Sequence, residues 1–160
     1  MKMNKRLGMF LAALTLLAFT RPGSAFASNS IACNNKLVTG SYGFTVQGTK
    51  LGGSGPTGLQ VGVALAQFDG NGNFTQVDTV TIGGTVVSDF THTPATGTYQ
   101  ISADCTGTFT INFTDGRPPV VANLVVVDNG NEIDTVVTSV GGEQGILATS
   151  SIGKKRFSIH

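Results

Sequence analysis

Two carboxylates offer the sharpest case for chemistry in this chain. Glu132 and Asp134 are separated by one residue, so on a β-strand they project from the same face with Cα atoms roughly 6–7 Å apart. In a water-poor lumen such a pair could divide the roles of acid and base, because burial raises a carboxyl pKa and a neighbouring charge separates the two pKa values. The alternative is that Ile133 and Val137 face the core and both carboxylates face water. Both interpretations stay open.

A second group of polar side chains alternates with apolar ones. Gln76 and Asp78 share one predicted strand face with Phe74, Val80 and Ile82. If that face is internal, Gln76 and Asp78 are candidate ligand contacts and Asp78 is a further catalytic candidate. If it is external, they belong to the ordinary surface.

Familiar catalytic signatures are absent from the sequence. It has no Gly-x-Ser-x-Gly elbow, no His-Glu-x-x-His, no phosphate loop and no dinucleotide fingerprint. His92 would have to serve any Ser-His-Asp or Cys-His mechanism, but it stands in a polar segment typical of an exposed loop. Asp69, Asn71 and Asn73 open like a calcium loop, yet the glycine and glutamate that an EF-hand needs next are missing. We therefore expect no metal and no cofactor.

The first residues read as an export signal. A basic start precedes an apolar run over 7–19, which is too short to span a bilayer, and Pro22-Gly23 then breaks the run. Ala25-Phe26-Ala27 has the small-x-small pattern of a signal-peptidase site. We expect residues 1–27 to be a cleaved signal peptide and residues 28–160 to form one domain, secreted or periplasmic. No membrane contact is expected after cleavage; an uncleaved anchor is the alternative.

Cleavage changes the charge balance. The whole chain has ten Lys and Arg against nine Asp and Glu, but Lys2, Lys5, Arg6 and Arg21 leave with the signal, so six bases face nine acids. The one basic cluster, residues 154–156, is most simply a solvated strand end. Nucleic acid is not expected as a partner.

Cysteine usage fits an exported protein. Cys33 and Cys105 are the only two cysteines, and an even count in an oxidising compartment predicts a disulfide. The bond would tie the N-terminal arm to the start of a later strand. A metal pair or a catalytic thiol is disfavoured because there is no CxxC and histidine is scarce.

The mature chain reads as an all-β protein. Turn sequences such as Asp69–Asn73 and Asp128–Asn131 place Gly or Asn where positive φ is needed, which predicts tight hairpins. Such short connections favour an up-and-down antiparallel meander. Closing it into a barrel of about eight strands removes the exposed edges; a two-sheet β-sandwich is the alternative. The strands are expected at 38–47, 59–68, 73–82, 84–91, 96–104, 106–114, 119–128, 132–140 and 144–152.

A Thr-Gly-Ser/Thr-aromatic phrase occurs three times, beginning at Thr39, Thr96 and Thr106. In each copy we expect the glycine to admit the chain from a turn and the following large residues to bury one face. The uneven spacing disfavours a solenoid or propeller. Tyr42 and Tyr99, which belong to the first two copies, are most simply core residues; the alternative is that they line a ligand pocket.

The order of these strand starts and turns also carries a family resemblance. It rests on Leu37–Phe44, Phe68–Gly72, Thr96–Tyr99 and Asp104–Thr108, with Glu132-Ile133 after a Gly-Asn turn. In this order the chain resembles small exported bacterial proteins of the allene oxide cyclase barrel-like family. The resemblance implies an eight-stranded antiparallel barrel with a central cavity. Related barrels are cyclases and dirigent proteins, many of them oligomeric; none of their catalytic residues maps onto this sequence.

These observations lead to three expectations of function. The first is an exported, non-enzymatic barrel that binds a small apolar ligand or serves as a structural or interaction module. The alternative is a cofactor-free cyclase or isomerase, or a dirigent-like guide of a reactive intermediate. A separate expectation is surface assembly into a homo-oligomer through the doubly apolar strand at 119–128. An open cavity holding Glu132, Asp134 or Asp78 would favour the enzyme, and an entirely apolar one the carrier.

Overall fold

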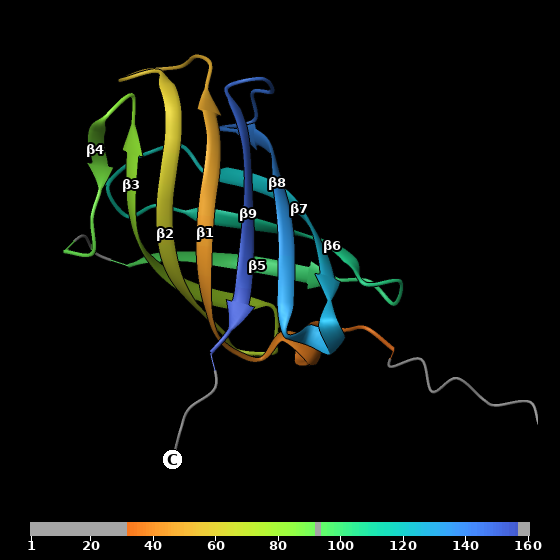
Figure 1. Cartoon of the computed structure of the whole chain (residues 1–160). Coiled ribbons are helices and arrows are strands. Elements are labelled where there is room, and N and C mark those ends of the chain that lie inside the picture. Colours follow the sequence, from red (N-terminus) through yellow and green to blue (C-terminus); the bar gives the residue numbers. More distant parts are fainter. Residues whose placement is uncertain (1–31, 92–93, 157–160) are drawn as a thin grey trace, which may run out of the picture.

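The strands of this protein pair in a closed ring (Figure 1). The computed structural model describes residues 32–91 and 94–156. All strand pairs are antiparallel, and each wall strand pairs with its neighbours in the chain, apart from the closures between β9 and β1 and between β3 and β5. The wall consists of β1 (Gly40–Lys50), β2 (Gly58–Phe68), β3 (Asn73–Ile82), β5 (Ala95–Ile101), β6 (Thr106–Asn112), β7 (Val120–Val127), β8 (Glu132–Val140) and β9 (Leu147–Lys155).

This arrangement confirms the predicted eight-stranded up-and-down barrel and overturns the sandwich alternative. A short ninth strand, β4 (Thr85–Ser88), pairs with β3 alone and stands beside the wall. Gly83 and Gly84, both with positive φ, form the turn between β3 and β4. Among the described residues, no helix is long and apolar enough to cross a membrane. The predicted signal peptide and both histidines lie outside the described residues.

Aromatic side chains fill one end of the barrel. Tyr42, with no exposed surface, meets the edge of Phe68 at a ring-centroid distance of 5.4 Å, and Phe68 meets Tyr99 in the same way at 5.0 Å. The short 3-10 helix η1 (Asn35–Val38) caps this end with Val38, which is fully buried. The end of the barrel next to η1 is therefore solid, and we call it the closed end.

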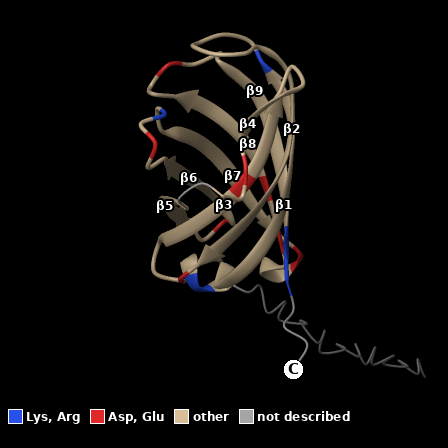
Figure 2. Ribbon diagram, turned by 90° about the vertical axis from the view of Figure 1, so that its left-hand side faces the viewer, with Lys and Arg blue, Asp and Glu red and all other residues tan. Residues whose placement is uncertain are grey.

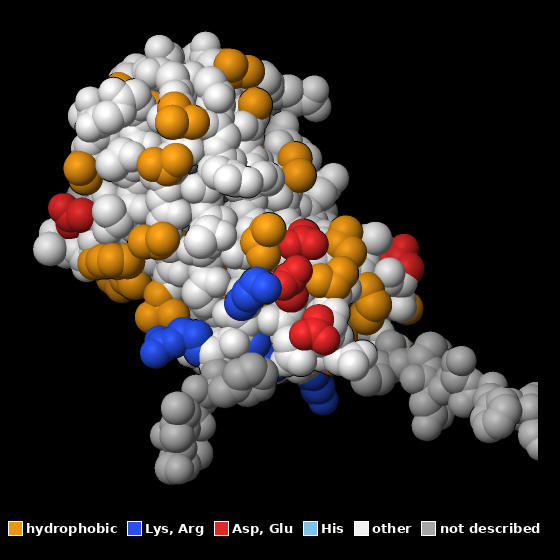
Figure 3. Space-filling view, in the orientation of Figure 1, with side chains coloured by type: hydrophobic (Ala, Val, Ile, Leu, Met, Phe, Trp, Pro, Cys, Tyr) orange, Lys and Arg blue, Asp and Glu red, His pale blue; other side chains and the backbone are white. Residues whose placement is uncertain are grey.

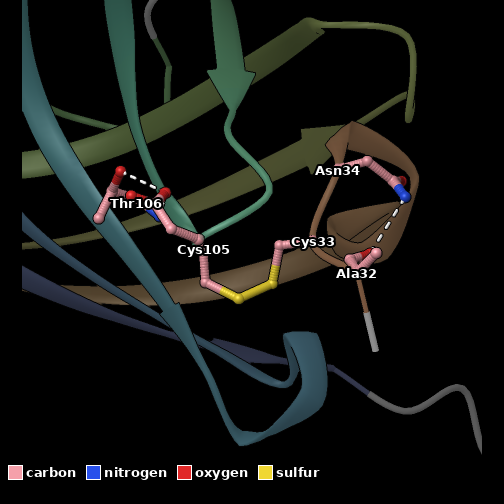
Figure 4. The surroundings of a disulfide bond; sticks show 6 residues. Ala32, Cys33, Asn34, Cys105 and Thr106 are labelled. Atoms are coloured by element: carbon pink, nitrogen blue, oxygen red, sulfur yellow. Dashed lines mark hydrogen bonds between the residues drawn. A yellow bond between two sulfur atoms is a disulfide. The ribbon is translucent and has the colours of Figure 1, made fainter. Parts of the chain in front are cut away.

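The predicted disulfide joins Cys33 to Cys105 and is confirmed (Figure 4). It links the segment before η1 to the turn between β5 and β6. Cys105 has a φ of 68° and its carbonyl accepts a hydrogen bond from the Val126 amide at 2.8 Å, so this turn is also held to β7. The bond thus fastens the N-terminal arm across the closed end.

Glycines of the repeated phrase have two different roles. Gly40 has a φ of 125° and begins β1, as predicted. Gly97 and Gly107 instead lie inside strands without positive φ. A Cβ at Gly97 would approach the Phe74 ring to 2.2 Å, and one at Gly107 would approach the Gln100 carbonyl oxygen to 2.1 Å. In these two copies glycine is required for close approach rather than for entry from a turn.

Candidate ligand cavity

A cavity of about 380 Å³ lies between the aromatic closed end and the loops at the opposite end of the barrel. We call that opposite end the open end. The inward row of β2 carries small residues at Gly62, Ala64 and Ala66, and of these Ala64 lines the cavity. The large apolar residues of β2 face outward instead: Leu59 is 65% exposed and Val63 is 47% exposed. The volume falls within the range of about 300–1,000 Å³ typical of small-molecule sites.

Most of the cavity wall is apolar. Phenylalanines come from β1, β2, β3, β6 and the segment after β6, and the branched aliphatic side chains include those of β3, β6 and β8. Charged residues lie mainly in turns and at strand ends, so the wall itself carries few of them (Figure 2). Representative lining residues are Phe44, Phe74, Phe109, Val80, Ile111 and Val137.

One polar cluster interrupts this lining. The Gln76 side-chain amide donates to Asp78 Oδ2 at 3.0 Å, and the Ser88 hydroxyl donates to Asp78 Oδ1. Gln76 and Asp78 lie on the inward row of β3, while Ser88, only 2% exposed, comes from the end of β4. The pairing between β3 and β4 shifts register at Val80/Thr81, and this irregularity lies next to Ser88, the partner of Val80.

Two further polar pairs in the lumen satisfy each other. The hydroxyls of Thr135 and Ser151 are 2.6 Å apart, and Thr149 donates to the Gln60 side-chain oxygen at 2.9 Å. The first pair joins β8 to β9, and the second joins β9 to β2 across β1 and leaves the amide nitrogen of Gln60 available in the lumen.

Two cations lie near the open end. The Arg117 guanidinium carbon stands 4.0 Å from the centre of the Phe113 ring, and its Nε donates to Asp115 Oδ2 at 2.8 Å. Lys50 Nζ donates to the Ser54 carbonyl oxygen. Desolvation acts to raise the pKa of Asp115, but the backbone and side-chain hydrogen bonds from Arg117 together with its positive charge lower this pKa overall.

The predicted ligand residues divide between the two ends of the barrel. Gln76 and Asp78 face the lumen together, as the internal-face interpretation requires.

Tyr42 and Tyr99 are core residues of the closed end and do not line the cavity. The Tyr42 hydroxyl donates to the Gly130 carbonyl, and burial raises the pKa of Tyr42 to about 12. The Tyr99 hydroxyl accepts from the Gly70 amide at 2.9 Å and donates to the Asn35 carbonyl at 3.2 Å.

The carboxylates of β8 lie on the outer face rather than in the lumen. Ile133 and Thr135, which are 1% and 5% exposed, occupy the inward row, so Glu132 and Asp134 point the other way. Glu132 forms a salt bridge of 3.0 Å with Lys154, and this hydrogen bond raises the pKa of Lys154. Acidic and basic side chains meet on this face among scattered hydrophobic ones (Figure 3).

Asp134 has an unusual setting on that outer face. It pairs in register with Val125 on β7 and Ile152 on β9, which are 44% and 43% exposed. One of its oxygens, Oδ1, is buried without a hydrogen-bond partner. Val125 is thus an exposed apolar residue on the outer face of β7, in line with the doubly apolar pattern of the sequence at 119–128. Assembly through this face stays a prediction.

Sequence reasoning missed the row of small inward residues on β2, of which Ala64 lines the cavity. Alternating small residues at Gly62, Ala64 and Ala66 were a readable signal, because such a row cannot fill a barrel interior. No signal pointed to Ser88, which contacts Asp78 and lines the smaller neighbouring hollow only because β4 folds back on β3. Among the described residues, no three His, Cys, Asp or Glu side chains gather so that they could hold a metal ion.

No family model, curated protein or solved structure matches this chain.

Proposed function

We propose that this protein binds a small, largely apolar ligand in the barrel lumen. The observation that carries the proposal is the cavity of about 380 Å³, lined by inward-facing aromatic and aliphatic side chains. At roughly 30 Å³ for each water-sized group, such a volume accommodates about a dozen non-hydrogen atoms. A linear or monocyclic compound of that size would bury most of its apolar surface, which is the main source of affinity in such sites.

The barrel is suited to this role because its wall is already formed. Closed strand pairing fixes the lining side chains, and the Cys33–Cys105 bond fastens the cap of the closed end. A preorganised site loses little conformational entropy on binding. Together with the predicted signal peptide, the disulfide supports a carrier that works outside the cytoplasm, either secreted or periplasmic.

A second candidate function is a cofactor-free cyclase or isomerase, in line with the resemblance to the allene oxide cyclase barrel-like family. The observation that favours it is Asp78, a carboxylate inside the cavity. Among the described lining residues it is the only carboxylate, and its two oxygens already accept from Gln76 and Ser88. Acid–base chemistry shared between two carboxylates has no second member there, so binding is the better-supported function.

Calorimetric titration with decan-1-ol tests the binding proposal, because this alcohol matches the size of the cavity. We expect one molecule to bind per barrel and Ala64→Phe to abolish binding, since Ala64 lines the lumen and a phenyl group would occupy it. Ala148→Phe is the matched control, because Ala148 is exposed on β9 and does not line the cavity. A thermal unfolding measurement on each variant checks that both are folded. Equal affinity in the two variants would contradict lumen binding.

A further inference from the structure

We propose that the ligand of this lumen carries a primary ammonium head group, held by Asp78 with Gln76 and Ser88, while its apolar body fills the cavity. The inference rests on the proposed lumen binding and adds the chemical class of the ligand. It is carried by three features of the polar cluster. These are its unused hydrogen-bond acceptors, the negative charge of the Asp78 carboxylate, and the break in strand pairing beside the cluster.

The hydrogen-bond inventory leaves mainly acceptors facing a ligand. Asp78 has only acceptors, so the Gln76 atom 3.0 Å from Oδ2 must be the amide nitrogen, and the orientation of that amide is fixed. The Ser88 hydroxyl donates its single hydrogen to Asp78 Oδ1. The unused groups are the remaining carboxylate lone pairs, Gln76 Oε1, the lone pairs of Ser88 Oγ and one amide hydrogen. A donor-rich head group is the complement of this set.

The negative charge of Asp78 favours a cationic ligand group. Neither ion pair formed within the described residues involves Asp78, and both of its hydrogen-bond donors are neutral. Arg117, which lines both hollows together with Asp78, is paired with Asp115. A partly buried carboxylate surrounded by apolar wall favours a positively charged partner more strongly than water-exposed carboxylates do. An ammonium group supplies one charge and three donors.

The barrel wall opens beside this cluster. β3 pairs with β5 over only Asn73–Gln76, and beyond that point it pairs with β4 instead. A smaller hollow of about 170 Å³ lies at this gap, and Gln76, Asp78, Phe113 and Arg117 line both it and the main cavity. The head group would therefore sit where the two spaces meet, within reach of Asp78, with its chain extending among the apolar residues.

A series with one chain length and three head groups tests the inference. Decylamine, decan-1-ol and decanoate are titrated against the full mature protein at neutral pH. We expect decylamine to bind about tenfold more tightly than the alcohol, because hydrogen bonds to a charged group are stronger than neutral ones, and decanoate to bind most weakly. Equal affinity of amine and alcohol, or preference for decanoate, would overturn the assignment; the latter would direct attention to Lys50 and Arg117.

Substitutions locate the effect. Asp78→Asn preserves the shape of the side chain and removes its charge, so the amine-to-alcohol ratio should fall to about one while the alcohol still binds. Glu143→Gln is the charge-matched control: Glu143 is an exposed residue of the β8–β9 loop that does not line the cavity, and the ratio should not change. An unchanged ratio in Asp78→Asn would refute the role of Asp78. Failure of all three compounds to bind would contradict the lumen-binding function and this inference with it.

Discussion

Asp78 lies directly opposite Ala64 across the antiparallel pair of β3 and β2. The relationship sets the carboxylate of the lumen beside one of the smallest side chains of the wall. Neighbouring pairs follow the same plan, because Gly62 opposes Val80 and Ala66 opposes Gln76. A larger residue at position 64 would crowd the carboxylate, so the small side chain of Ala64 leaves both space in the cavity and access to its polar group.

The first prediction concerns a glycine under an aromatic ring. A Cβ at Gly153 on β9 would stand 2.3 Å from the Phe44 ring, so Gly153→Ala must push that ring into the cavity. We expect a loss of about 1–3 kcal/mol of unfolding free energy, as for other overpacked cores, together with weaker binding of decan-1-ol. Gly43→Ala is the control, since no atom lies within 4 Å of its Cβ position. Urea denaturation and calorimetry measure the two effects; similar behaviour of both variants would contradict the packing argument.

The second prediction concerns the disulfide. It encloses a separation of 72 residues, for which the chain-entropy estimate is about 4 kcal/mol before any native strain is subtracted. The double substitution Cys33→Ser with Cys105→Ser should therefore lower the free energy of unfolding by about 2–4 kcal/mol in urea denaturation. A loss well below 1 kcal/mol would show that the N-terminal arm is held by its other contacts.

The third prediction concerns ionisation of the tyrosines. The chain has two tyrosines and no tryptophan, so tyrosinate absorbance reports Tyr42 and Tyr99 alone. Burial raises both pKa values, that of Tyr42 from 10.0 to about 12. Because the tyrosines of the unfolded state ionise at lower pH, the protonated tyrosines of the folded state contribute to the free energy of unfolding. For Tyr42 this contribution is complete below pH 10 and is lost as the pH rises toward 12. Tyr42→Phe should remove the later absorbance step; a native titration indistinguishable from that in urea would contradict burial of the hydroxyl.

Tyr42→Phe also tests the closed end directly. The substitution leaves the Gly130 carbonyl without its hydroxyl donor while preserving the ring contacts with Phe68. We expect a loss of about 1–3 kcal/mol at neutral pH, the usual cost of an unsatisfied buried acceptor. Ligand binding should not change, because Tyr42 does not line the cavity. A change in affinity without a change in stability would contradict the separation of the two ends.

The fourth prediction concerns the β2–β3 turn. The Asn73 side chain and amide and the Asn71 amide donate to the Asp69 carboxylate, at 3.0, 3.0 and 2.7 Å, and these bonds lower its pKa below 3.8. The stabilisation is therefore present above pH 3.8 and is lost as the pH falls through the lower folded value. Asp69→Asn should be less stable than the native protein at neutral pH, with the difference shrinking in acid. A difference independent of pH would argue against these bonds.

The strands and turns of the barrel could be predicted from the sequence better than the pairing of β4 and the residues that face the lumen. Asp69–Asn73 and Asp128–Asn131 were readable as hairpins because their φ requirements are local, and the Cys33–Cys105 pair followed from a count of two. The displacement of β4 from the wall was not readable, since Gly83-Gly84 specifies a turn but not which strands pair beyond it. Register and closure depend on contacts distant in sequence.

The site residues were ambiguous for a related reason. Alternation assigns Gln76 and Asp78 to one face of β3, but it does not say which face is inside when both carry mixed side chains. At β8 the exposed Val136, 57% accessible, made the outer face look as apolar as the inner one, so the side of Glu132 and Asp134 was undetermined. Only the ring closure assigns a strand face to the lumen.

Methyl chemical shifts during titration with decan-1-ol test the central claim most directly. Adjacent residues on one strand face opposite sides of the wall, so each inner methyl has an outer neighbour as its internal control: Ala64 against Val63, and Val137 against Val136. We predict saturable shifts for the inner methyls Ala64, Val80, Ile111 and Val137, with the outer ones unmoved. Shifts confined to the outer methyls, or none at any ligand concentration, would contradict a ligand-binding lumen.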